Sequence, residues 1–179
     1  KAPGRGAWVG APRAEIESAQ SAGKLKGALA RAFKRGDLEL PENLSELIEN
    51  ALTRALLDRL GLEMRVGRLI LGTARIAEQA RGGAVALLLH ASDASEDGRK
   101  KLDQAWRVGR EAEGSGERGI ELPLDRDALS VALGRDNVVH LALADTAAAA
   151  RVLKPLTRLM HYLGHTMPAA DGSADLRAT

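Results

Sequence analysis

The stretch Ala84-Val85-Ala86-Leu87-Leu88-Leu89 decides the fold class, because it is the longest apolar run of the chain. Six apolar residues suit a buried strand and fall far short of the roughly 20 that a membrane span needs. Helical patterns lie on both sides of it. Gly72-Thr73 opens one that runs to about Arg81, and Ser95 is a good N-cap for another that runs to about Val108. A buried strand between two helices predicts an α/β fold.

The alternation of strand and helix patterns continues in both directions. Further strands are expected at 68–71, 120–124 and 138–143, and further helices at about 42–61, 125–134 and 146–163. Asp125 or Asp127 is expected to cap the helix that ends at Gly134, and Asp145 or Thr146 the last one. Strands separated by helices predict an α-β-α sandwich.

The first quarter of the chain has a different character. Gly4-Arg5-Gly6-Ala7-Trp8-Val9 predicts a tight turn entering a strand, and two short helices are expected after it, from Pro12 and from Lys24 to Lys34. An arginine and an aromatic residue beside a basic helix are typical of nucleic-acid contact, which makes Arg5, Gly6 and Trp8 candidates. The alternative is that Trp8 fills a core.

Basic charge is concentrated in the same quarter. Residues 1–40 hold eight Lys and Arg against four acids, a net charge of +4, whereas the rest of the chain carries −2. Such a patch is the electrostatic footprint of a phosphate-binding module, although a solvated helix face would look the same. The basic candidates of the second helix are Lys24, Lys26, Arg31, Lys34 and Arg35. The helix also carries an apolar stripe at helical spacing, Leu25, Ala28, Leu29, Ala32 and Phe33.

The G-R-G-A-W-V segment and the helices after it resemble the bacterial YlxR family. The resemblance implies a basic nucleic-acid-binding module at residues 1–40. The family usually has a preceding R-x-C region, which is absent here, and a cysteine where this chain has Gly10. Since the chain starts with Lys1, a leading segment is expected to be missing. Modules of about 40 residues rarely fold alone, so we expect this one to pack on the next domain through its apolar stripe.

The alternating block is similar to the bacterial YlxQ family, within the superfamily of kink-turn-binding ribosomal proteins. The residues that carry this resemblance are 60–62, 67–68, 72, 88–95, 129–134 and 138–143. It implies a three-layer sandwich around a small mixed sheet at residues 57–165. Residues 41–56 are then expected to be a helical connector and 166–179 a disordered tail.

Members of that superfamily bind structured RNA at one end of the sandwich through a G-T-N-E-x-x-K signature. Here Gly72 and Thr73 match, whereas Ala74, Arg75 and Glu78 replace the amide, the acid and the lysine. Alanine cannot hydrogen-bond a base edge, so phosphate contacts at a helix N-terminus are expected instead. Their candidates are Arg68, Gly72, Thr73, Arg75 and Arg135. The alternative is a sandwich that has lost RNA binding and serves for packing or protein contact.

Catalytic and cofactor motifs give no support for an enzyme. Gly114-Ser115-Gly116-Glu117-Arg118-Gly119 matches G-x-G-x-x-G, but it follows a helix and precedes a strand, which predicts a connector and not a dinucleotide site. The chain contains no cysteine, and so no thiolate metal site or disulfide. His161 and His165 have the spacing of a metal pair without a third ligand nearby, and His90 and His140 are expected to be structural. We expect no catalytic residue, metal or cofactor.

These patterns together predict a non-enzymatic, cytoplasmic protein that binds structured RNA, such as ribosomal or another stable RNA. By resemblance, its role is expected in translation, RNA processing or ribosome assembly. DNA binding with a role in transcription is a rival, since it would use the same basic patch. A protein-interaction module without nucleic acid is a second rival. No membrane partner is expected, and protein partners stay open.

Overall fold

The computed structural model describes residues 10–167, which form two short helices, then a long helix and an α/β region. The elements, in chain order, are α1 Arg13–Ser21, α2 Lys24–Phe33, α3 Leu44–Arg65, β1 Leu69–Leu71, α4 Thr73–Arg81, β2 Leu87–His90, α5 Glu96–Gly109, β3 Ile120–Glu121, α6 Arg126–Leu133, β4 His140–Leu143 and α7 Thr146–Tyr162. The turn predicted at Gly4–Val9 lies outside the described residues, as does most of the tail predicted at 166–179.

The four strands form one small mixed sheet in the order β1-β4-β2-β3. β4 is antiparallel to both β1 and β2, whereas β2 and β3 are parallel. Leu88 is paired with Ala142, and His90 with His140, across β2 and β4. The parallel pair is joined by α5, as a parallel connection requires.

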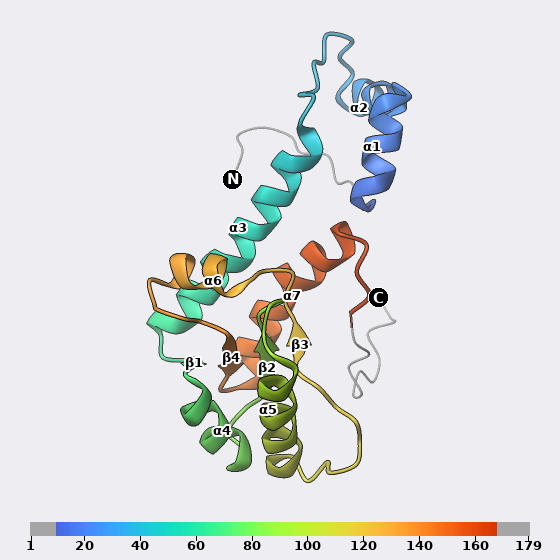
Figure 1. Cartoon of the computed structure of the whole chain (residues 1–179). Helices are drawn as coiled ribbons and strands as arrows, with labels where there is room; N and C mark the ends of the chain where they lie inside the picture. The colour runs from blue at the N-terminus through green and yellow to red at the C-terminus, as the bar shows by residue number, and fades with distance from the viewer. Residues whose placement is uncertain (1–9, 168–179) are drawn as a thin grey trace.

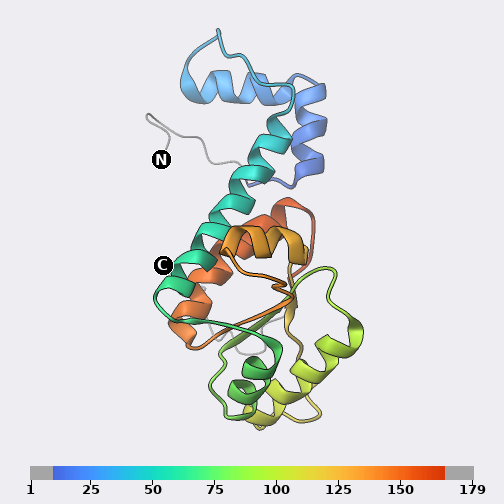
Figure 2. The ribbon, with the colours of Figure 1, turned by 60° about the vertical axis from the view of Figure 1, so that its left-hand side comes forward.

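Helices cover both faces of the sheet, which confirms the predicted three-layer α-β-α sandwich (Figures 1 and 2). Leu87 and Leu89 belong to a core that includes residues of α3, α6 and α7. Leu88 belongs to a second core, with residues of α4 and α5. Because successive side chains of a strand point to opposite faces, the apolar run that looks uniform in sequence fills two separate cores.

Several predicted boundaries shift in the structure. The helix expected to end at Gly61 is longer, since α3 runs on to Arg65. Leu60 and Glu63 are both buried, so packing continues across Gly61, where an added Cβ would meet nothing within 4 Å. Side-chain caps are found where they were expected: Ser95 accepts from Gly98 N, and Asp125 and Asp145 cap α6 and α7.

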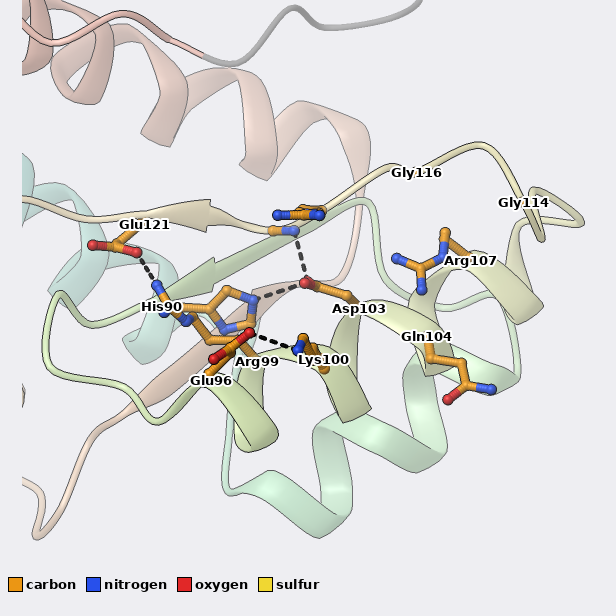
Figure 3. A pocket seen from close by; sticks show the side chains of 12 residues that line it. His90, Glu96, Arg99, Lys100, Asp103, Gln104, Arg107, Gly114, Gly116 and Glu121 are labelled. Carbon is orange, nitrogen blue, oxygen red and sulfur yellow. Dashed lines mark hydrogen bonds and ion pairs between the residues drawn. The ribbon is translucent and has the colours of Figure 1, made fainter.

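The loop that carries the G-x-G-x-x-G pattern connects α5 to β3, as predicted (Figure 3). Gly114 and Gly116 have φ values of +85° and +77°, a left-handed backbone that favours glycine. The third glycine, Gly119, has a different role, because its Cα lies against buried side chains. The pattern thus combines two turn glycines with one packing glycine.

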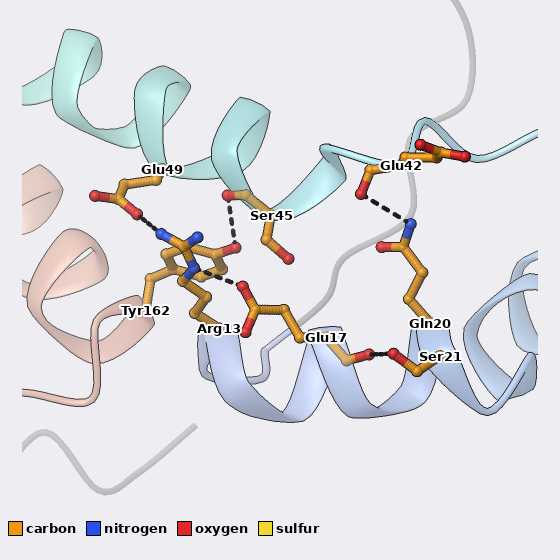
Figure 4. Close-up of polar contacts among 8 residues, drawn as sticks. All are labelled: Arg13, Glu17, Gln20, Ser21, Glu42, Ser45, Glu49 and Tyr162. Carbon is orange, nitrogen blue, oxygen red and sulfur yellow. Dashed lines mark hydrogen bonds and ion pairs between the residues drawn. The ribbon is translucent and has the colours of Figure 1, made fainter.

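The N-terminal helices contact α3 through α1, so the predicted contact through the apolar stripe of α2 is wrong. Ile16 of α1 is 3% exposed, whereas no residue of α2 is buried. Arg13 pairs with Glu49 of α3 and with Glu17, and Tyr162 of α7 donates a hydrogen bond of 2.9 Å to the carbonyl of Ser45 (Figure 4). Gly23, at φ +69°, turns the chain after α1 and directs α2 away from the sandwich.

One helix, α3, runs through the boundary expected between connector and sandwich. Its N-terminal part lies beside α1 and its C-terminal part beside α7 (Figure 2). Glu63 on this helix is 2% exposed and accepts two hydrogen bonds from Arg151 of α7, at 2.7 and 2.8 Å. The hydrogen bonds from Arg151 lower the pKa of Glu63 below its ordinary value, against the opposing effect of burial. This paired charge fixes the alignment of the two long helices.

Replacing Arg151 by Ala is expected to lower the free energy of unfolding by about 2 kcal/mol at pH 7, because it leaves a buried carboxylate with weaker pairing. A carboxyl whose pKa is lowered by folding stabilises above its ordinary pKa of 4.5 and loses that contribution below it. The difference in unfolding free energy between the wild type and the variant should therefore narrow as the pH falls below 4.5. Urea unfolding of both proteins at pH 7 and at a pH below 4.5 measures this difference. Arg54→Ala, which removes an exposed pair with Asp58 at 3.9 Å, is the control and should change little.

Candidate nucleic-acid interface

A cavity of about 800 Å³ opens where the N-termini of α4 and α5 approach the start of β4. Gly72 and Thr73 line it from the first turn of α4, and Arg135 lines it from the loop after α6. Gly72 and Thr73 therefore share one cavity with Arg135, which is distant from them in sequence, and all three are predicted to bind phosphate. They meet there because α4 follows β1, and β4, which follows Arg135, is paired with β1.

The N-terminus of α4 has no side-chain cap. Its N-cap is Gly72, at φ +90°, a conformation that residues with a Cβ rarely adopt. Among the hydrogen bonds of the described residues, none accounts for the backbone N–H groups of Thr73, Ala74 and Arg75. Free N–H groups at a helix N-terminus attract anions, so this turn can hold a phosphate oxygen.

Two arginines give the cavity positive charge. Arg135 is exposed and forms no ion pair with any residue in the described part of the chain. Arg126 is engaged, since its Nε donates to Asp93 Oδ2 at 2.5 Å and its Nη2 to the Asp93 carbonyl. One acid, Asp136, also lines the cavity. Arg135 is therefore the cation that is available to a ligand.

The other predicted residues of the sandwich do not line this cavity. Arg75 is exposed on the first turn of α4 but outside the lining. Arg68 precedes β1, at the opposite end of that strand from Gly72, and lies 3.4 Å from Asp145. The end of the sandwich therefore uses only part of the predicted set.

The basic residues of the N-terminal part form a separate surface. Lys24, Lys26, Arg31, Lys34 and Arg35 are all exposed on α2 and just after it, and Arg35 pairs with Asp37 at 3.0 Å. α2 lies near the start of α3, whereas α4 and α5 lie at the far end of the molecule (Figures 1 and 2). The 22 residues of α3 correspond to about 33 Å of helix. The predicted residues Arg5, Gly6 and Trp8 lie outside the described residues.

A buried chain of three polar side chains leads away from the cavity. His140 lines the cavity, and its Nδ1 lies 2.9 Å from Nδ1 of His90. His90 Nε2 lies 3.1 Å from Oδ1 of Asp103 on α5, and the same oxygen accepts from Gly119 N at 2.8 Å. All three residues are at least 93% buried. Buried polar groups need such partners, because an unpaired one costs several times a typical net hydrogen bond.

Two glycines make room for this chain. A Cβ on Gly119 would lie 2.5 Å from His90 Nε2 and 2.9 Å from Leu88 Cγ, which is impossible without movement. A Cβ on Gly98 would lie 3.1 Å from His140 Nε2, a tight contact. Glycine at these positions lets α5 and the β3 loop approach the two histidines closely.

The chain ends in a second cavity, of about 670 Å³, lined by His90 and Asp103 (Figure 3). Two of its basic side chains are paired, Lys100 with Glu96 at 2.6 Å and Arg99 with Glu121, whereas Arg118 is exposed and has no ion pair among the described residues. Three acids, Glu96, Asp103 and Glu121, line this cavity, against one in the cavity beside α4. It is therefore a weaker candidate for an anionic ligand.

Burial is the main cause that lowers the pKa of His140 from 6.5 to about 4. The neighbouring His90 lowers the pKa further, as do Arg126 and Arg99, while Asp103 acts in the opposite direction. His140 is therefore neutral at pH 7. In a neutral imidazole one ring nitrogen carries a proton and donates a hydrogen bond, and the other has a lone pair and accepts one.

The sequence pattern predicts that His90 and His140 lie on or at the end of strands, but it does not predict that they contact each other and Asp103. The available signal was Asp103 itself, an acid among Leu102, Ala105 and Trp106 on the buried side of its helix. His161, considered for a metal pair, has Nε2 3.4 Å from the Gly10 carbonyl. Within residues 10–167, no three His, Cys, Asp or Glu side chains form a group suited to a metal ion.

No family model matches the chain, and no curated protein matches it. It is similar to the solved structure of a protein with unknown function from Bacillus halodurans, with 22% identity and a TM-score of 0.48. The match covers 57% of this chain and 96% of that one. The resemblances to YlxR and YlxQ stay predictions.

Within the described helices, none is long and apolar enough to cross a membrane.

Replacing Gly119 by Ala is expected to lower the free energy of unfolding by about 2 kcal/mol, because the new methyl group overlaps His90 and Leu88. Gly61→Ala is the matched control. An added Cβ there meets no atom within 4 Å, and alanine favours the helix, so a gain of about 0.5–1 kcal/mol is expected. Urea unfolding of both variants measures the difference, and equal stabilities would contradict the close approach of Gly119.

The lowered pKa of His140 predicts a pH-dependent stability. In the unfolded chain the imidazole of His140 binds a proton near pH 6.5, whereas in the folded protein it does so only near pH 4. The free energy of unfolding therefore falls as the pH decreases from 6.5 to about 4. Between pH 7 and pH 5 the loss from this residue is about 2 kcal/mol. His140→Asn, which does not titrate, should lack that loss. Urea unfolding at the two pH values compares the proteins, and parallel losses would refute a neutral, buried His140.

Proposed function

We propose that this protein binds structured RNA and has no catalytic role, with the cavity beside α4 as one contact surface. The observation that carries the proposal is the pairing of an uncapped helix N-terminus with an unpaired arginine in one cavity. Thr73 N–H and Arg135 offer hydrogen-bond donors from two elements. Phosphate oxygens are the ligands that such donors suit best.

A polymer is favoured over a small anion because the basic surfaces lie far apart. The lysines and arginines of α2 are exposed, and α2 is separated from α4 and α5, whose first turns line the cavity, by the length of α3 (Figure 1). An extended polyanion can touch both surfaces, and binding at two modest sites raises overall affinity. A free phosphate or nucleotide would leave the basic surface of α2 without a role.

The resemblance to YlxR and YlxQ supports RNA over DNA. It suggests a bacterial, cytoplasmic protein whose targets belong to translation, RNA processing or ribosome assembly. The departures at Ala74, Arg75 and Glu78 favour recognition through phosphates rather than through base edges at α4. DNA binding and a protein-interaction role without nucleic acid are the outcomes that compete with this proposal.

Arg135→Gln is expected to weaken binding of the full chain to a bulged RNA stem-loop and to reduce the salt dependence. Loss of one phosphate contact lowers the slope of log affinity against log salt by about 0.7–0.9. Fluorescence anisotropy at several salt concentrations measures both quantities. Arg81→Gln, an equally exposed change at the other end of α4, is the control and should keep the wild-type slope.

Equal slopes for the two variants would contradict the assignment of Arg135. Duplex DNA of the same sequence is the competitor that separates the rivals. Stronger competition by DNA than by unlabelled RNA would favour the transcription role. No binding of either nucleic acid above a control protein would refute the proposal and favour a protein-interaction module.

A further inference from the structure

His140 offers the cavity a hydrogen-bond acceptor beside the donors of Thr73 and Arg135. Its Nε2 has no partner among the described residues, although the residue is 93% buried and lines the cavity. Nε2 is not among the buried, unpartnered atoms of the described residues, so it is open to the cavity. A ligand in the cavity that carries a donor can therefore reach it.

The two partners behind His140 decide which nitrogen is bare. Asp103, as a carboxylate, only accepts hydrogen bonds, so His90 Nε2 must carry the proton between them. With a single proton on each ring, His90 Nδ1 is then an acceptor, and His140 Nδ1 donates to it across 2.9 Å. One proton on Nδ1 leaves His140 Nε2 with a free lone pair.

The backbone keeps this lone pair accessible. Gly98 lies on the first turn of α5, and an added Cβ there would lie 3.1 Å from His140 Nε2. Position 98 belongs to a helix, where glycine is less favourable than alanine. A glycine at this position therefore has a local cost and an evident local effect, which is to leave Nε2 uncovered.

We infer that His140 Nε2 accepts a hydrogen bond from a nucleotide of the bound RNA, and that Asp103 and His90 hold it in the tautomer that can do so. The inference rests on the proposed function. The donor on the nucleotide is a ribose hydroxyl or a base amine, placed next to the phosphate that α4 and Arg135 hold. His140 is thus a specificity-determining residue, and Asp103 and His90 are positioning residues.

The tautomer is tested first, without any ligand. Long-range ¹H–¹⁵N NMR spectra of the full chain at pH 8, where an imidazole of ordinary pKa is neutral, report which ring nitrogens carry protons. We expect the proton on Nε2 of His90 and on Nδ1 of His140. A proton on Nε2 of His140 overturns the inference, whether or not the protein binds RNA.

Binding is tested with His140→Asn. The asparagine amide can still donate to His90 Nδ1, but it places no atom where Nε2 lies. We expect this variant to bind the bulged RNA stem-loop about fivefold more weakly than the wild type, as for one lost hydrogen bond. Gly98→Ala, whose methyl group covers Nε2, should weaken binding similarly while keeping the histidine NMR pattern. Wild-type affinity in both variants overturns the inference and leaves the proposed function standing.

The same stem-loop with 2′-O-methyl riboses in its loop and bulge identifies the donor. If the donor is a ribose hydroxyl, methylation weakens wild-type binding about fivefold and has little further effect on His140→Asn. If the donor is a base amine, methylation leaves the difference between the two proteins intact. No binding of any RNA by the wild type refutes the proposed function itself, and this inference with it, while the NMR result stands separately.

Discussion

The two-residue period of the central strands is the constraint on which this structure depends. β2 and β4 lie in the middle of the sheet with helices on both faces, so neither face of either strand can be polar without a partner. Leu87 and Leu89 enter the larger core, and Leu88 enters the smaller one. The same alternation sends the side chain that follows Leu89 toward α5. The alternation of the strand therefore buries His90, and a buried imidazole needs hydrogen-bond partners. His140 and Asp103 are those partners.

Those partners explain features that otherwise have no common cause. His140 is paired with His90 across the sheet, and Asp103 approaches from α5. Gly119 and Gly98 then provide the space that the two rings need. A core that accepts one buried histidine thus requires a second histidine, an acid and two glycines. The arrangement ends at His140, which lines the cavity beside α4, so the same packing also shapes the surface that we propose binds RNA.

The second organising feature is α3, which separates the two basic surfaces. Its C-terminal part is part of the larger core, where Leu56 and Leu60 are fully buried, and Glu63 pairs with Arg151. Its N-terminal part extends beyond the sandwich and is held by α1. A long helix anchored at one end by apolar packing is a rigid spacer, which suits a protein that contacts one extended ligand at two places.

The sequence by itself determined the alternation of strands and helices, the capping residues Ser95, Asp125 and Asp145, and the layered α/β class. Each of these depends on neighbours within a few residues, where periodicity and side-chain chemistry are sufficient. It also identified Gly72, Thr73 and Arg135 as candidates, by resemblance. It predicted the wrong end for α3, at Gly61, and the wrong docking face for the N-terminal helices, because both depend on residues of other elements that pack against them.

Only the tertiary structure decided the order β1-β4-β2-β3, the meeting of α4 with Arg135 and the chain from Asp103 to His140. These join residues up to 74 positions apart, and their pairing is set by the packing of the two cores.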